Sequence, residues 1–201
     1  SKEQLAEEAC MIEIETLGAP IGRQDQYAAS FGGVNSIRFG ENGVQVEPIE
    51  VSEELSQKFS ENFTLVFTGL TRSATKVLSE ESDDEADKSS RMREIRKHAD
   101  EAASHLENGD LESLGAILNQ TWLSKRGVSS MVTNTQIDEL YEKAISSGAI
   151  GAKLLGAGNG GFLLVCGNRG LRDLLQRELG EDHRMFPLEI DYSGSRIIFG
   201  S

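Results

Sequence analysis

A single carboxylate, Asp25, stands in a short segment rich in turn-forming residues. The segment covers residues 18–33, GAPIGRQDQYAASFGG, with Pro20 and Gly22 just before Asp25. Glycine and proline set the backbone of such a stretch through turn geometry, so we expect a turn to hold Asp25. A carboxylate held in this way can accept or orient the proton of a hydroxyl nucleophile. The alternative is a cap on a helical turn over residues 26–30.

A second glycine cluster lies much later in the chain, between a helix-like run and a strand-like run. It reads GAIGAKLLGAGNGG over residues 148–161. Its last glycines let backbone N–H groups approach an anion or another loop without side-chain obstruction; they are Gly156, Gly158, Gly160 and Gly161. A tight turn between two strands is the structural alternative, and both interpretations can hold together. Two such segments predict one site assembled from distant parts of the chain.

Several basic side chains are candidates for holding an anionic substrate. Arg72 follows a predicted strand and begins a predicted helix, so its guanidinium and the helix N-terminus can act together. Further candidates for the same task are Arg23, Lys125, Arg126 and Lys153. Each of them is individually typical of an ordinary surface charge. Only a local basic pocket would overcome the acidic character of the chain.

Composition limits the classes of partner and site. The 201 residues include 33 acidic and 20 basic side chains, and the net charge of -13 disfavours nucleic acid and anionic membranes as partners. Cys10 and Cys166 show neither a disulfide framework nor zinc-site spacing. His98 and His105 lack the spacing of about four residues that helical metal pairs prefer. No arrangement typical of a hydrolase can be assembled.

The cellular context follows from two further features of the sequence. No apolar run approaches the roughly 20 residues that a membrane-spanning helix needs, and no basic-then-apolar leader is present. We therefore expect a cytoplasmic protein. The sequence starts at Ser1 without methionine, and we expect a truncated or processed chain.

Apolar periodicity and turn residues predict the order of the elements. Helices are expected over residues 2–16, 71–78, 88–107, 110–124 and 171–179, with one more between a Thr133 cap and Gly148. Strands are expected over 63–68, 153–155 and 162–166, with one or two more within 185–199 and a hairpin over 35–51 that turns at Glu41-Asn42-Gly43. The acidic tract at 80–87 is predicted to be a solvated loop.

Strands lie both before and after the helical run, and some strand pairs are close in sequence. This order favours an α+β architecture with an antiparallel sheet.

The two glycine-rich segments together resemble the GHMP family of small-molecule kinases. The pattern G-x-P-x-G-x-x-D-Q-Y-x-A-x-x-G-G, followed by GA-x-G-x-K-L-x-GAG-x-GG-F, is most similar to its bacterial D-glycero-D-manno-heptose 7-phosphate kinases. The resemblance implies that residues 1–55 are the remainder of an N-terminal domain and that 56–201 form a ferredoxin-like C-terminal domain. The family's phosphate-binding loop, of the type P-x-x-x-G-L-G-S-S-A, does not occur in these 201 residues.

The resemblance also implies roles for single residues. Asp25 matches the aspartate proposed as the base in galactokinase and mevalonate kinase. Glu13 matches a magnesium-binding glutamate of several members, although Glu13 and Glu15 also suit a solvated helix face. The glycine loop at 156–161 would pack near phosphates, and Arg72 with other basic groups would hold the distal phosphate of the sugar.

The activity implied by the family is ATP- and Mg²⁺-dependent phosphorylation of the anomeric hydroxyl of a heptose 7-phosphate. We expect the 201-residue chain alone to be inactive, and a homodimer is an open possibility. Another sugar specificity, such as fucose or galactose, is one alternative. The other is a non-catalytic module that binds a sugar phosphate.

Overall fold

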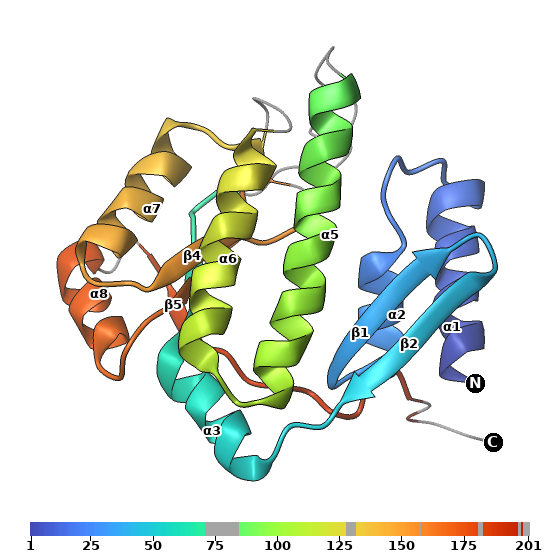
Figure 1. The fold of residues 1–201 in the computed structure, drawn as a ribbon, viewed down its shortest axis with the longest axis horizontal. Helices are drawn as coiled ribbons and strands as arrows, with labels where there is room; N and C mark the ends of the chain where they lie inside the picture. Colours follow the sequence, from blue (N-terminus) through green and yellow to red (C-terminus); the bar gives the residue numbers. More distant parts are fainter. Residues whose placement is uncertain (71–84, 128–131, 157, 181–182, 197, 199–201) are drawn as a thin grey trace. The chain divides into compact units, whose positions relative to one another are not determined.

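The computed structural model describes residues 1–70, 85–127, 132–156, 158–180, 183–196 and 198 (Figure 1). The chain divides into two compact units. The first consists of Ser1–Val51 with Ile190–Ser201, and the second of Ser52–Glu189. The helix expected over 71–78, Arg72 within it and residues 80–84 of the expected acidic loop lie outside the described residues.

The first unit is built from helices followed by a β-hairpin. Its elements are α1 (Lys2–Cys10), the π-helix η1 (Met11–Thr16), α2 (Gln24–Phe31), β1 (Val34–Gly40) and β2 (Gly43–Ile49). The Ser1 side chain accepts a hydrogen bond from Gln4 N at 3.2 Å, which caps α1. The long helix expected over residues 2–16 is thus α1 continued by η1, and the predicted hairpin is present.

The hairpin buries one face against α1 and α2. The antiparallel register pairs Ile37 with Val46 and Phe39 with Val44, so apolar side chains alternate onto the same face. Ile37 and Val46 pack against a small core of Ala6, Cys10 and Tyr27. This period-two burial explains why a hairpin forms from a sequence that only partly alternates.

The end of the chain returns to this unit. Gly33 N donates to Asp191 O at 2.7 Å, and Ser195 N donates to Ser30 O at 3.2 Å. The backbone after Pro187 therefore forms loop contacts with α2 and with the residues that follow α2. This explains why the strand expected over 185–199 is much shorter in the structure.

The second unit combines a sheet with helices. Its helices are α3 (Glu53–Asn62), α5 (Glu85–Glu107), α6 (Leu111–Arg126), α7 (Thr135–Ser146) and α8 (Leu171–Leu179), and its strands are β3 (Phe63–Phe67), β4 (Gly151–Leu154), β5 (Phe162–Cys166) and β6 (Met185–Pro187). The strand order is β4-β5-β3-β6, and every neighbouring pair is antiparallel. This order and the β–helices–β–β–α–β connectivity are those of a ferredoxin-like sheet. The α+β prediction is confirmed.

One face of this sheet forms the main core of the unit. Val66, Leu154 and Leu163 lie on it and are almost completely buried. They belong to one apolar cluster with side chains of α7 and α8, among them Ile137 and Leu175. The sheet is therefore held by non-directional apolar burial that also fixes which face each strand presents.

Helix α6 approaches the opposite face of β4 very closely (Figure 1). A methyl group built on Gly151 would lie 2.0 Å from Gly115 O, and one built on Gly115 would lie 2.6 Å from Cys166 Sγ. Both distances are too short for a real contact, so only hydrogen fits at these two positions. Two glycines thus set the distance between helix and strand.

Several local predictions were wrong. Helix α3 was not predicted, although Ser52 caps it by accepting from Leu55 N at 3.1 Å. Helix α7 is capped by Asn134 rather than Thr133, because Asn134 is extended and its Oδ1 accepts from Ile137 N at 3.1 Å. Residues 85–87, expected in a loop, begin α5.

Among the described residues, no helix is both long and apolar enough to cross a membrane.

We predict that Gly151→Ala destabilises the second unit by about 1–3 kcal/mol, because the new methyl group overlaps backbone atoms of α6. Thermal or urea unfolding followed by circular dichroism measures the change. Gly40→Ala is the matched control, since Gly40 is also a strand glycine and its nearest atom would be 3.8 Å away. Equal stability of the two variants would contradict the close approach of α6 to β4.

A second prediction concerns pH. Tyr27 is 2% exposed, and burial together with its hydrogen bond to Glu7 raises its pKa to about 12. Because the folded-state pKa lies above the ordinary value, the stabilisation is complete below about pH 10 and disappears as the pH rises towards 12. We expect Tyr27→Phe to cost about 1–2 kcal/mol at pH 7.

The measurement is the urea midpoint of wild type and Tyr27→Phe from pH 8 to pH 12. The wild type should lose more stability than the variant between pH 10 and pH 12. Tyr141, whose pKa burial also raises, is present in both proteins and cancels in the comparison. Parallel curves over this range would show that Tyr27 does not titrate as described.

Candidate active site

Asp25 lies in the first turn of α2 and is exposed to solvent. The expectation that a turn holds it is corrected by this position. Helix α2 begins at Gln24. The N-cap residue, Arg23, makes no capping hydrogen bond with its side chain. A carboxylate in the first turn is stabilised by the unpaired N–H groups and the dipole of the helix. Asp25 is therefore a carboxylate fixed on a rigid element and open to a ligand.

Glu13 is linked to α2 through Gln26, the residue that follows Asp25. The Gln26 Nε2 group donates a short hydrogen bond to Glu13 Oε2. The Ala19 N–H group donates to Glu13 O at 3.0 Å, which fixes the end of η1. The Glu13 carboxylate is thus oriented by α2.

Gln26 carries an unusual feature. It is 7% exposed, and its Oε1 atom is buried without a hydrogen-bond partner. Buried polar atoms are normally paired, and exceptions concentrate at sites of function or of unseen water. Sequence reasoning did not select Gln26, although it directly follows Asp25 in the motif.

A single carboxylate fits Mg²⁺, because this ion usually binds one or two protein carboxylates together with substrate phosphates and water. Among the described residues, no group of three or more His, Cys, Asp or Glu side chains could enclose a metal ion. His98 and His105 do not form a pair: Nδ1 of His98 lies 3.3 Å from Thr121 Oγ1, and Nδ1 of His105 lies 3.3 Å from Asp110 Oδ2.

Arg23, a predicted substrate-binding residue, belongs to a cluster between α1 and α2. Its guanidinium lies 2.7 Å from Glu7 Oε1 and 5.6 Å from the centre of the Tyr27 ring. Tyr27 OH donates to the same carboxylate. These contacts give Arg23 a part in packing the two helices, beside any part in binding.

The glycine loop lies in the second unit, between β4 and β5. Its described glycines, Gly156, Gly158, Gly160 and Gly161, all have positive φ angles, which side chains rarely adopt. A methyl group on Gly158 would lie 2.6 Å from Val132 O, and one on Gly160 would lie 2.9 Å from Leu70 O. By contrast, no atom lies within 4 Å of a methyl group built on Gly156 or Gly161. The loop therefore has a packed inner side and an open outer side.

Main-chain hydrogen bonds hold this loop in place. Asn159 N donates to Val132 O at 2.7 Å, and Gly161 N donates to Leu70 O at 2.9 Å. Gly161 O accepts from both N and Oγ1 of Thr68 at 2.9 Å. Segments on either side of the helical run in the sequence thus meet at the loop. This is the structural counterpart of the tight turn considered above.

Asn159 is a functional candidate that sequence reasoning missed. It is 5% exposed and is the sole described residue other than glycine with a positive φ, 57°. Its Oδ1 accepts from Asn134 Nδ2. Asparagine is the non-glycine residue best suited to this backbone conformation, so the sequence Gly-Asn-Gly contained a signal.

Of the remaining basic candidates, one contacts the same loop and one lies outside the described residues. Lys125 Nζ donates to Gly156 O. Arg126 lies 3.0 Å from Asp138 Oδ1 and 5.7 Å from the centre of the Tyr141 ring. Lys153 lies on β4, and its burial lowers its pKa. Arg72 is not described, so its placement is a prediction.

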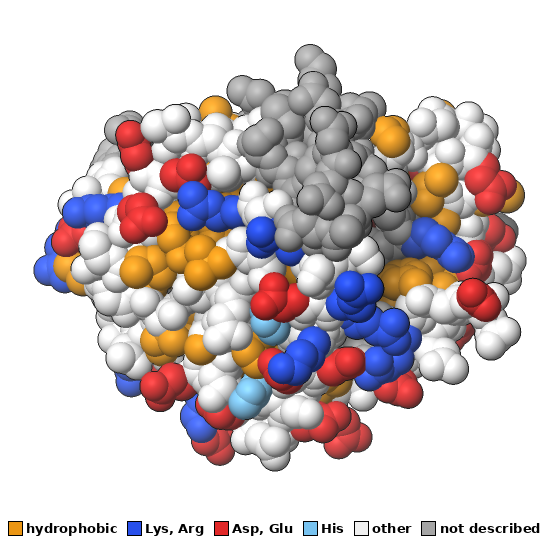
Figure 2. Space-filling model, turned by 45° about the horizontal axis from the view of Figure 1, so that its top comes forward, with side chains coloured by type: hydrophobic (Ala, Val, Ile, Leu, Met, Phe, Trp, Pro, Cys, Tyr) orange, Lys and Arg blue, Asp and Glu red, His pale blue; other side chains and the backbone are white. Residues whose placement is uncertain are grey.

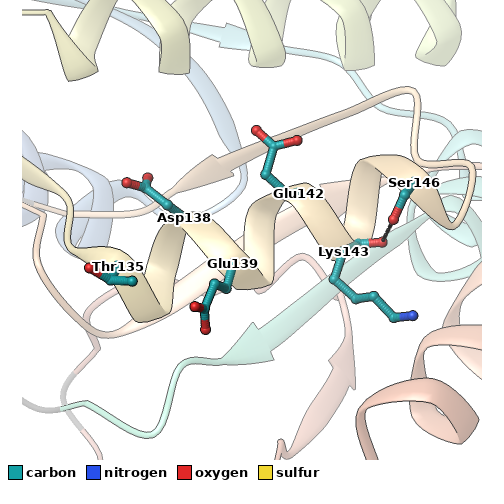
Figure 3. Close-up of a pocket in the computed structure, with 6 residues that line it drawn as sticks. All are labelled: Thr135, Asp138, Glu139, Glu142, Lys143 and Ser146. Atoms are coloured by element: carbon teal, nitrogen blue, oxygen red, sulfur yellow. Dashed lines mark hydrogen bonds between the residues drawn. The ribbon is translucent and has the colours of Figure 1, made fainter.

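One hollow among the described residues has a mainly acidic lining. Figure 2 shows acidic and basic side chains interspersed on the face it presents. A shallow hollow of about 570 Å³ lies along α7 (Figure 3), and three of its six lining residues are the acids Asp138, Glu139 and Glu142. Such a lining repels a phosphorylated ligand.

Comparisons with known proteins bear on both units. The family model described as "GHMP kinases C terminal" matches residues 102–184. The D-glycero-alpha-D-manno-heptose 7-phosphate kinase of Campylobacter jejuni is 35% identical over 163 residues, which cover 80% of this chain and 48% of that protein. The mevalonate kinase of Aeropyrum pernix is 33% identical over 150 residues, covering 73% of this chain and 43% of the relative.

Solved structures agree on the fold. A putative sugar kinase from Campylobacter jejuni superposes with a TM-score of 0.67 and 28% identity over 96% of this chain and 56% of that one. A D-glycero-D-manno-heptose 1-phosphate kinase from Bacteroides thetaiotaomicron gives a TM-score of 0.67 at 23% identity over 92% of this chain and 51% of that one. The chain spans about half the length of the curated relatives it matches. With its C-terminal domain matched by the family model and its fold shared with these kinases, the chain belongs to the GHMP kinase family.

Proposed function

We propose that the protein to which this chain belongs is an ATP-dependent sugar kinase that phosphorylates the anomeric hydroxyl of a heptose 7-phosphate, giving a heptose 1,7-bisphosphate. The observation that carries the proposal is the 35% identity over 163 residues to a protein named as a heptose 7-phosphate kinase. An exposed, helix-held Asp25 and an open glycine loop are the groups that such chemistry needs.

Phosphoryl transfer from ATP asks the protein for position and charge neutralisation more than for covalent chemistry. The anomeric oxygen attacks the γ-phosphorus, the bond to the β-phosphate oxygen breaks, and ADP leaves. In the proposed mechanism the Asp25 carboxylate accepts a hydrogen bond from the sugar hydroxyl and takes its proton as the new bond forms. The first helical turn holds Asp25 at the start of α2, where it is exposed to solvent.

Glu13 is the proposed protein ligand of Mg²⁺, which would neutralise charge on the phosphates of ATP. The Nε2 group of Gln26 holds the Glu13 carboxylate in one orientation. Gln26 therefore acts as the supporting residue of that ligand. Because Gln26 and Asp25 are neighbours on α2, one helix start would position both the base and the metal ligand.

The sugar phosphate needs cationic and dipolar partners in an acidic chain. The glycine loop at 156–161 is proposed to lie near the transferred or distal phosphate. Arg72, Arg23 and Lys153 are the proposed basic partners, together with Lys125 and Arg126. A cytoplasmic location and a homodimer stay predictions of the same proposal.

Two alternatives are distinguished by a substrate panel. One is another sugar specificity, fucose or galactose; the 27% identity over 202 residues to the bifunctional fucokinase/GDP-fucose pyrophosphorylase of Arabidopsis thaliana supports fucose. A non-catalytic module would bind sugar phosphate without consuming ATP. Assays of the full-length protein with heptose 7-phosphate, fucose and galactose, reading ADP release, separate the three. The 201-residue chain alone is expected to release no ADP.

Asp25→Asn tests the base. The amide keeps the shape of the side chain but cannot take a proton, so we expect kcat of the full-length enzyme to fall by about 100- to 10,000-fold. The KM values should change little, because the amide can still hydrogen-bond the hydroxyl. Activity within twofold of wild type would remove Asp25 from the mechanism.

Glu13→Gln tests the metal ligand, with Glu15→Gln as the matched control on the exposed part of η1. Loss of the Glu13 charge should raise the Mg²⁺ concentration for half-maximal activity by about 10- to 100-fold, in the range found for disturbed metal sites. The control should keep the Mg²⁺ dependence of the wild type. Identical Mg²⁺ curves for both variants would assign Glu13 to the helix surface.

A further inference from the structure

The Asn159 side chain in the middle of the glycine loop is hydrogen-bonded through its oxygen, and its nitrogen has no described acceptor. It is 5% exposed, and its Oδ1 accepts a hydrogen bond from Asn134 Nδ2. No described group accepts a hydrogen bond from its own Nδ2. This Nδ2 group is not among the buried polar atoms that lack a partner, so it reaches the surface of the loop, where a ligand can contact it.

The orientation of this amide is determined by its neighbour. Asn134 Oδ1 is occupied as the cap of α7, accepting from Ile137 N at 3.1 Å. Asn134 must therefore present its Nδ2 group to Asn159, which in turn must present an oxygen. The N–H groups of Asn159 are thereby directed away from α7.

Two backbone donors of the loop have acceptors in the described chain, and two others do not. Val132 O accepts from the backbone N–H of Asn159, and Leu70 O accepts from that of Gly161. The backbone N–H groups of Gly158 and Gly160 have no described partner. Because Gly156 and Gly161 border open space, a ligand can approach from that side.

We propose that Asn159 Nδ2 donates a hydrogen bond to a phosphate oxygen of the ligand bound at the glycine loop, and that Asn134 sets the amide for this contact. The inference rests on the proposed function and adds to it a specificity-determining side chain. A group that only accepts, such as a phosphate oxygen, matches a set of donors better than a hydroxyl does. The phosphate can be that of ATP or that of the sugar.

Asn159→Asp is the decisive variant. The carboxylate keeps the shape of the amide, can still accept from Asn134, and tolerates the positive φ. The N–H donor, however, is replaced by a carboxylate oxygen, whose negative charge faces the phosphate. We expect the KM of the full-length enzyme for either ATP or heptose 7-phosphate to rise at least about 10-fold while kcat changes less, and the substrate affected identifies the phosphate.

Three further variants distinguish a contact between Asn159 and the ligand from a role of Asn159 in stabilising the fold. Asn159→Gly keeps the backbone conformation and removes the donor, so it should raise the same KM by a smaller factor. Asn134→Asp keeps the α7 cap but forces Asn159 to turn its N–H group inward, so it should raise that KM too. Asn168→Asp adds a charge on an exposed loop residue and should leave both KM values unchanged.

The melting temperature is measured for each variant. A KM shift at an unchanged melting temperature supports the contact. Wild-type KM values in Asn159→Asp, or KM changes in the variants that only follow lost melting temperature, overturn it. If Asn159→Asp fails to fold, the KM of Asn159→Gly decides.

Failure of the proposed function gives a different result. If the wild type releases no ADP with any sugar tested, the kinase proposal fails, and the Asn159 contact is then tested by calorimetric binding of ATP and inorganic tripolyphosphate. Binding by the wild type that weakens at least about 10-fold in Asn159→Asp supports the contact. Equal affinities, or no binding by the wild type, overturn it.

Discussion

The conformation of the glycine loop between β4 and β5 depends on backbone angles that residues with side chains rarely adopt. Four of its glycines have positive φ, and two of them face carbonyl groups at distances where only hydrogen fits. The loop is then fixed by main-chain hydrogen bonds to Val132 and Leu70, which come from segments far apart in the sequence. A shape of this kind does not rely on side chains, so its outer side stays free for a ligand.

In the first unit, two carboxylates are held by fixed donors, and a third lies at the start of a helix. Glu7 is paired with Arg23 and Tyr27, and these contacts fix α2 against α1. Glu13 is paired with the amide of Gln26, whereas Asp25 has only the helix start behind it.

Much of this architecture followed from local patterns. Helix α8 has the predicted bounds, and the hairpin turns at the predicted residues, because amphipathic periodicity and Asn-Gly turn chemistry are local signals. Helix α3 was missed because its apolar positions are few and its cap is a single serine. The cap of α7 was misassigned because Thr133 and Asn134 are both good caps, and only the extended backbone of Asn134 decides between them.

The candidate site was predictable in its motifs and not in its pairings. The sequence selected Asp25, Glu13 and the glycines, whose residue types carry the chemistry. It could not reveal that Gln26 meets Glu13 or that Asn134 meets Asn159, since these pairs join residues from different elements. Long-range pairs depend on packing, which no local pattern encodes.

The net charge of -13 helps to explain which hydrogen-bond donors are found at the loop. Lys125 donates to Gly156 O, and Arg126 pairs with Asp138 of α7, so these two cations stabilise the loop backbone and a helix. Backbone N–H groups and an asparagine amide carry no net charge, so they do not form ion pairs with the acidic side chains. They can nevertheless complement a phosphate at short range, where fixed dipoles are effective and distant like charges are screened beyond about 10 Å. We therefore expect anion binding in such a chain to depend on oriented dipoles, while cations such as Lys125 hold those dipoles in place.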